Sequence, residues 1–311
     1  MISGISMTCF FASYAVALAL EAWRLFPQIG AKLTERVRSV GLPAIAGAGL
    51  VAHTLYLAHR AATAHASPLS SPYDWCLLAA WALAVIYFVF ALIKPATSVG
   101  LFLLPAVMAL LGAALLADEQ PFAQERASRV WLGVHGSVLL LGTVSVIVGF
   151  IAGLMYLVQS YRLKHKRIPS RGLKLPSLEW LERANSRALL LSIALVGIGF
   201  VSGIVLNLIK HQNEAERVPW TDPVVVLTDV MFAWLAAAGI FSLVYKPARQ
   251  GRKVAYLTIA SLIFLAITLW AVLRGNTQHG GSGAATATSQ AATSHLVPTT
   301  SSRHDWPGGA A

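Results

Sequence analysis

The chain has 311 residues, of which 56% are hydrophobic and only 12% are charged, and its mean hydropathy is +0.65. Soluble globular domains carry about 25% charged residues, so this composition excludes an ordinary soluble protein. The net charge of +11 does not indicate a nucleic-acid-binding protein, because the basic residues stand in short segments between long apolar stretches. We therefore expect membrane lipid, and no nucleic acid, around this chain.

Eight apolar stretches are long enough to cross a bilayer as helices. They predict an all-α polytopic membrane bundle of about eight transmembrane helices, and the first of them is not expected to be a cleaved signal peptide, because its positive charges follow it. The predicted spans cover residues 4–26, 42–62, 74–93, 99–117, 128–161, 186–208, 225–245 and 254–273.

The chain divides into three parts by composition. Residues 1–127 contain spans one to four, and residues 128–274 contain spans five to eight as a core. Residues 275–311 are rich in Gly, Ser, Thr, Ala and Pro, which cannot bury a hydrophobic core, and this part is predicted to be a flexible tail.

Charge placement predicts the orientation of the spans. Alternation puts segments 27–41, 94–98, 162–185 and 246–253 on one side of the membrane. Together with the adjoining span ends they hold 17 of the 24 Lys and Arg residues. The positive-inside rule therefore places this side in the cytoplasm and both termini outside.

Small residues recur four apart in the fifth and sixth spans. Gly149 and Gly153 form one such pair, and Gly199 and Gly203 form the other. This spacing lets helix backbones approach closely in membranes. We therefore expect spans five and six to be neighbours.

Two of the nine histidines, His53 and His135, lie within apolar runs. His53 precedes Arg60 by seven residues, which is about 10 Å of helix. An ionisable side chain inside the membrane is costly and usually marks function. A histidine hydrogen-bonded to a neighbouring helix explains the same sequence, so this structural alternative stays open.

Three kinds of chemistry use buried imidazoles. A zinc site needs further Cys, His or acidic ligands, which these spans scarcely offer, and a proton relay needs carboxylates, which the spans of His53 and His135 lack. Haem needs only one or two axial imidazoles and an apolar, aromatic surround. The cysteines form no CxxC or CxxCH motif, so neither a thiol redox site nor covalently attached haem is expected on this chain.

The segment Trp220-Thr221-Asp222-Pro223 precedes the seventh span. Asp before Pro is typical of a helix start, with the carboxylate as N-cap and the proline at the first helical position. Capping alone accounts for Asp222 and Pro223, and a role for the Trp220 indole stays open.

Three motifs resemble the cytochrome c assembly family, which includes the CcsA-type (ResC-type) haem-handling subunits and the HemX-like membrane proteins. The first is the run from His53 to Arg60 with the following loop 65–74, similar to the family's second span and its Tyr-Glu loop. The second is Val134-His135-Gly136, which opens a long span, with the later Leu175-Pro176-Ser177-Leu178-Glu179. The third is Trp220–Pro223, which resembles the family's tryptophan-rich segment.

The resemblance implies a haem-handling subunit of cytochrome c biogenesis in the bacterial plasma (inner) membrane, with non-covalent haem b in transit. It implies His135 and His279 as axial ligands at the outer face, beneath a segment that contains Trp220 and Asp222. His53 is implied as an intramembrane ligand for haem arriving from the cytoplasm. A ResB-type subunit and apocytochrome c are the implied partners, and the chain would be one subunit of a haem lyase complex, with no stand-alone catalytic site.

The chain departs from the family pattern in two places. Residues 233–245 contain no histidine where the family has an intramembrane one, and the tryptophan-rich segment keeps a single Trp. A haem-free accessory or scaffold protein of the same fold, as implied for HemX-like relatives, is therefore the alternative. A transporter is a third possibility, but the sequence shows no internal repeat of the kind that transporters have.

Overall fold

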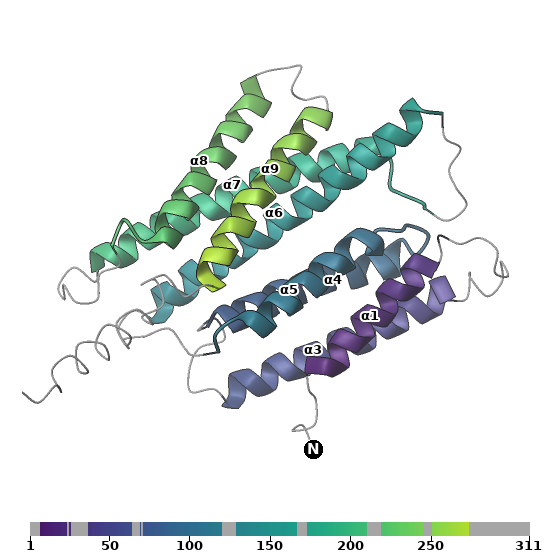
Figure 1. The fold of residues 1–311 in the computed structure, drawn as a ribbon, viewed down its shortest axis with the longest axis horizontal. Helices are drawn as coiled ribbons and strands as arrows, with labels where there is room; N and C mark the ends of the chain where they lie inside the picture. Colours follow the sequence, from purple (N-terminus) through teal and green to yellow (C-terminus); the bar gives the residue numbers. More distant parts are fainter. Residues whose placement is uncertain are drawn as a thin grey trace, which may run out of the picture.

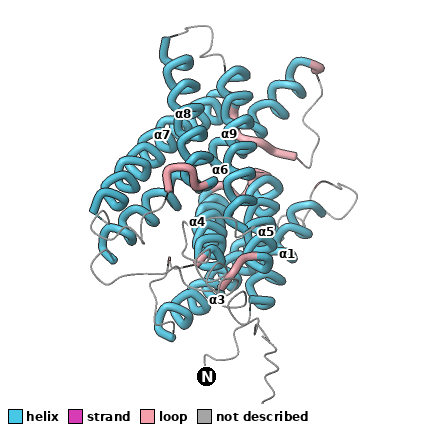
Figure 2. The backbone as a smooth tube through the Cα atoms, turned by 60° about the vertical axis from the view of Figure 1, so that its left-hand side comes forward, coloured by secondary structure: helices cyan, strands magenta, loops and turns pink. Residues whose placement is uncertain are grey.

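The structure is a computed structural model that describes residues 7–23, 25, 37–63, 69, 71–119, 129–166, 173–209, 219–244 and 251–273. Within these ranges the chain is helical apart from short loops, and they contain no strand (Figure 2). The predicted all-α fold is confirmed.

Eight α-helices and one short π-helix make up the described chain (Figure 1). Six of the α-helices are long and apolar enough to cross a membrane, while α1 and α5, at 17 residues each, are at the lower limit for a span. The elements are α1 (Met7–Trp23), η1 (Val37–Gly41), α3 (Leu42–Thr63), α4 (Pro72–Ile93), α5 (Gly100–Leu116), α6 (Arg129–Lys164), α7 (Leu178–Ile209), α8 (Pro223–Val244) and α9 (Gly251–Leu273).

The helices pack as two groups, and the long helix α6 belongs to the second group and lies beside the first (Figure 1). The first group contains α1, α3, α4 and α5, and the second contains α6 to α9; α6 also touches α4 and α5. Successive helices reverse direction. We name the end with Lys94, Arg162, Lys164 and Lys174 the basic end, and the end where α4, α6 and α8 begin the opposite end.

The interface between α6 and α7 is built on glycines, and these two helices make the most extensive contact in the bundle. A Cβ on Gly199 would collide with Leu139, and a Cβ on Gly142 would lie 3.0 Å from Cγ2 of Val196. Glycine at these two positions leaves the space that the Leu139 and Val196 side chains occupy between the helices. The prediction that spans five and six are neighbours is confirmed.

A buried amide joins three helices of the second group. In the orientation that satisfies its neighbours, the Asn185 amide donates to Oγ1 of Thr258 (3.0 Å) and to the Gly149 carbonyl (2.9 Å), and accepts from the Ala255 N–H (3.2 Å). Asn185 belongs to α7, Gly149 to α6, and the other two residues to α9. The side chain therefore ties α9 to the α6–α7 pair.

We expect Asn185→Ala to lower the free energy of unfolding by about 1–2 kcal/mol, because membrane interhelical hydrogen bonds average about 0.6 kcal/mol each and three are lost. Thermal unfolding in detergent, followed by circular dichroism, measures the loss. Thr268→Ala is the matched control, since the Thr268 hydroxyl donates only within α9, to the Phe264 carbonyl. Equal stability of the two variants would contradict this role for Asn185.

The two groups are also joined at the basic end. The Ser98 N–H donates to the Lys174 carbonyl over 2.7 Å, which connects the α4–α5 loop to the segment before α7. The Trp180 ring packs edge-on against Phe90 at 5.6 Å between centroids, and Nζ of Lys94 lies 5.3 Å from the centroid of the same indole. The run Leu175–Glu179 and the start of α7 therefore dock onto the first group.

Candidate functional site

His135 lies on the second turn of α6, near the opposite end. Its Nδ1 is 3.0 Å from the Gly199 carbonyl oxygen and 2.9 Å from Oγ of Ser202, both on α7. The Gly203 position of the same turn leaves room for the ring, because a Cβ there would lie 3.0 Å from Cε1 of His135. The small-residue motif of α7 thus forms the cradle of this imidazole, which we name the His135 cradle (Gly199, Ser202 and Gly203).

The cradle selects one tautomer of His135. A carbonyl oxygen only accepts hydrogen bonds, so Nδ1 must carry the proton that faces Gly199. The Ser202 hydroxyl donates to the same carbonyl over 2.8 Å, which leaves its oxygen lone pairs toward Nδ1–H. Nε2 is then the nitrogen with the lone pair. Metal-binding histidines commonly donate their other N–H to a carbonyl in this way.

Apolar surface surrounds the half-buried His135 ring at this end. Trp131 and Val134, on the same stretch of α6, are exposed. On the neighbouring side a Cβ at Gly136 would lie 3.6 Å from Cδ1 of Leu69 and 4.0 Å from Cζ2 of Trp75. The start of α4 therefore packs against α6 at Gly136, the residue that follows His135.

His53 has a very different environment in the first group. The side chain is 0% exposed, and its ring stacks on Phe10 of α1 with 4.2 Å between centroids and 1° between planes. Its Nδ1 is 3.4 Å from the Tyr14 hydroxyl, while its Nε2 is buried without a hydrogen-bond partner among the described residues. Nε2 is closed off from solvent, so the described residues leave no space for a porphyrin at His53 in this conformation.

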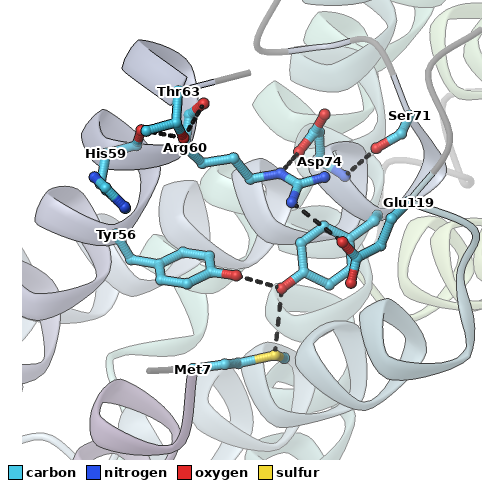
Figure 3. A network of polar contacts seen from close by, with 9 residues as sticks. Met7, Tyr56, His59, Arg60, Thr63, Ser71, Asp74 and Glu119 are labelled. Carbon is cyan, nitrogen blue, oxygen red and sulfur yellow. Dashed lines mark hydrogen bonds and ion pairs between the residues drawn. The ribbon is translucent and has the colours of Figure 1, made fainter. Parts of the chain in front are cut away.

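A polar network closes the opposite end of the first group (Figure 3). Arg60 on α3 pairs with Asp74 on α4 and with Glu119 after α5, where Nη1 is 3.4 Å from the carboxylate. The guanidinium lies 4.5 Å from the centroid of the Tyr73 ring, whose hydroxyl is 2.7 Å from that of Tyr56. These residues are the Arg and the Tyr-acid pair of the first sequence motif, and the structure brings them together.

The polar network orients the start of α4. Ser71 is the N-cap, its hydroxyl accepting from the Asp74 N–H over 3.1 Å, and Pro72 occupies the first turn. Because Trp75 follows directly, the same turn that carries Asp74 supplies the contact with Gly136 on α6. The turn of α4 that carries Asp74 of the Arg60 network therefore also contacts α6 at Gly136, next to His135 in the chain.

Residues 69–275 match the family described as cytochrome C assembly protein. The chain belongs to this family. No curated protein matches the chain. The match covers more than half of the chain and includes the His135 cradle, Asp74 and the segment 220–223, whereas His53 and Arg60 precede it and His279 follows it. The family and the six long apolar helices make this a multi-pass membrane protein of cytochrome c biogenesis.

Asp222 has the capping role that its sequence predicts. Its Oδ1 accepts from the Val224 N–H over 2.9 Å, and Pro223 begins α8. The carboxylate is buried, whereas the Trp220 side chain is 51% exposed. Asp222 therefore holds the start of α8, and the Trp220 side chain remains accessible.

The remaining candidates lie elsewhere. His279 falls outside the described residues, and His53 and His135 belong to different helix groups. No group of three metal-ligating side chains occurs among the described residues. A cavity of about 10 Å³, room for one water molecule, lies toward the basic end beside Glu21, Leu42, Tyr87 and Gly100, away from both histidines.

Sequence reasoning missed Asp229, an acidic residue inside the predicted seventh span. It lies on α8, six residues after Pro223, and no described residue forms an ion pair or hydrogen bond with it. A scan for carboxylates in every span, rather than in the two spans with histidines, would have found it.

Proposed function

We propose that this protein is a haem-handling subunit of cytochrome c biogenesis that presents non-covalent haem b at the opposite end of the bundle for attachment to apocytochrome c. The observation that carries the proposal is the hydrogen bond from Nδ1–H of His135 to the Gly199 carbonyl. It fixes the neutral tautomer that can bind iron through Nε2, and it raises the basicity of that nitrogen. Haem bound there would supply the iron and the porphyrin to which the cytochrome is joined.

The surroundings of His135 suit a large apolar ligand. The exposed side chains of Trp131 and Val134 offer contact area on α6, and Leu69 and Trp75 bound the neighbouring side. Trp220 is exposed at the start of α8, at the same end of the bundle. An axial imidazole in such a setting binds iron and tunes its potential. His279 remains the proposed second ligand.

Haem uptake at His53 needs a second conformation. Phe10 covers the face of that imidazole, and both side chains are fully buried. Transfer of haem through this point therefore requires α1 to move away from α3. The unpartnered Nε2 of His53 is the atom that such a movement would make available to iron.

The placement of basic residues supports the proposed membrane and orientation. The described basic residues Lys94, Arg162, Lys164 and Lys174 gather at one end, which the positive-inside rule assigns to the cytoplasm of a bacterial plasma membrane. Both termini and the His135 cradle would then face the outside, where apocytochrome c is matured. A ResB-type subunit is the proposed partner at that face.

A haem-free scaffold is the second candidate. The closed packing of His53 and the absence of histidine from residues 233–245 favour it. The scaffold would use the same helices to hold maturation partners without touching haem. Co-purification with such a partner in the absence of any pigment distinguishes it from the haem-handling subunit.

The visible absorption spectrum of detergent-purified protein from haem-replete cells tests the proposal. We expect a haem band that is largely lost in His135→Ala, because the iron loses its axial nitrogen. His165→Ala is the control, since His165 is exposed at the basic end and bonds only locally to the Tyr161 carbonyl. A protein without a band, or a band indifferent to His135→Ala, leaves the haem-free scaffold as the function.

A further inference from the structure

Asp229 is a carboxylate placed at membrane depth. It stands six residues inside the apolar helix Pro223–Ser242, which is about 9 Å along the axis. An aspartate side chain is too short to reach the interface over that distance, unlike Lys or Arg. Acidic residues inside spans are rare and costly, and they almost always face a partner or a polar cavity.

The described chain offers Asp229 no such partner. No described residue ion-pairs or hydrogen-bonds with it, and Arg60, a described cation at the same end of the bundle, is held by Asp74 and Glu119 in the other helix group. Helix α8 packs mainly on α7 and α9. Asp229 is half-buried at the margin of the α8 face that these neighbours leave uncovered.

The residues on that face have the sizes and spacing that are typical of a surface on which a second helix packs. Asp229, Ala233 and Ala237 follow one another four residues apart, so they line one side of α8, and both alanines are exposed. Val226 and Val230 beside them are exposed as well. Small side chains at this spacing let a second helix approach closely, and a polar side chain at the edge adds an interhelical bond.

We propose that this α8 face (Val226, Asp229, Val230, Ala233 and Ala237) docks a transmembrane helix of another protein, whose Lys or Arg pairs with Asp229. The negative charge of Asp229 indicates a basic residue on the partner helix, because a carboxylate in hydrocarbon requires a cation or a strong hydrogen-bond donor. A second copy of this chain is disfavoured, since a two-fold contact on this face would oppose two like charges. A proton relay is disfavoured because relay carboxylates line the interior of a bundle.

The test uses the full-length chain in nanodiscs and synthetic apolar helices of about 23 residues, with energy transfer between a donor dye on the chain and an acceptor on the peptide. One peptide carries a single Lys seven residues from its end; its control carries Leu there. We expect the Lys peptide to bind at least tenfold more tightly than the Leu peptide, and Asp229→Leu to remove the difference. Asp229→Lys should reverse it, with a Glu peptide now preferred.

Thr228→Val, in the same turn, is the matched control and should leave the preference for the Lys peptide unchanged. Circular dichroism verifies that each variant keeps its helices. Equal binding of the Lys and Leu peptides to the wild-type chain would overturn the proposal. Energy transfer between two labelled copies of the chain would also overturn the proposal if Asp229→Leu abolished it. The helix docked on this face would then belong to a second copy. Neither result depends on haem, so the outcome is separate from the test of the proposed function.

Discussion

Removing the hydroxyl that supports His135 should weaken haem binding about 10- to 100-fold, because outer-shell partners of a metal-binding histidine typically contribute that much. Ser202→Ala is the variant, since the Ser202 hydroxyl lies 2.9 Å from Nδ1 of His135 and 2.8 Å from the Gly199 carbonyl. Without it the imidazole keeps the carbonyl contact and loses its lateral restraint. Titration of haem into the purified protein, read from the absorption band, measures the change.

A second variant changes Gly203, the cradle residue that faces Cε1 of His135. In Gly203→Ala the new methyl group would lie 3.0 Å from Cε1 of His135, tight enough to tilt the ring away from its productive position. The matched control is Gly142→Ala, whose methyl group would lie 3.0 Å from Cγ2 of Val196 across the same α6–α7 interface. Both variants place a methyl group 3.0 Å from a side chain of the facing helix, but only the first touches the histidine.

The comparison separates a positioning role from a packing role. We expect the two glycine variants to lose similar amounts of thermal stability, while haem affinity falls in Gly203→Ala alone. The ligand-field features of the spectrum should also shift in Ser202→Ala, because the hydrogen bond to Nδ1 sets the basicity of Nε2. Parallel losses of affinity in both glycine variants would show that the α6–α7 contact, not the His135 cradle, governs binding.

Hydropathy predicted which segments are helical, but it misplaced the ends that polar residues control. The sixth span was expected over 186–208, whereas α7 begins at Leu178. Ser177 caps it, with its hydroxyl 3.3 Å from the Trp180 N–H, and Leu181 is fully buried. The first two turns mix charged and apolar residues, so a search for continuous apolar runs passed over them.

The long helix α6 shows the same effect at its other end. It continues to Lys164, beyond the predicted limit of residue 161. Basic side chains in the last turn are favourable at a helix C-terminus, and the helix stops before Lys166, which adopts a positive φ of 49°. Apolar content alone does not predict where a helix that ends in basic residues stops.

The sequence was sufficient to predict which residues belong to the candidate site, but not which residues they contact. The glycine spacing alone indicated that α6 and α7 are neighbours. The register of the two helices, which places His135 against Gly203, depends on how the side chains of both helices pack together. The partner of His53 was equally hidden, since Phe10 lies 43 positions earlier and nothing in the local sequence pairs them. Tertiary packing decides whether an intramembrane imidazole is open or closed.

Breaking the Arg60–Asp74 pair should be among the most destabilising single changes in the first group. The Asp74 side chain is 8% exposed, and removing the cation that faces a buried carboxylate typically costs about 3–5 kcal/mol. We therefore expect Arg60→Ala to unfold at a markedly lower temperature or denaturant concentration in detergent. Glu119→Gln is the control: its side chain is 66% exposed, and an exposed pair contributes about 0–1 kcal/mol.

A double variant decides whether the charge itself or the absence of its partner is responsible. Replacing both members of a buried pair by apolar residues is often neutral, so Arg60→Met with Asp74→Leu should recover most of the stability lost in Arg60→Ala. The same cycle has a second readout at the other site, because Asp74 and Trp75 share the first turn of α4, and Trp75 borders Gly136 beside His135. If the Arg60 network positions this turn, haem affinity falls in Arg60→Ala and stays low in the double variant even when stability returns. Recovery of both quantities together would mean that the network stabilises the bundle without positioning the histidine.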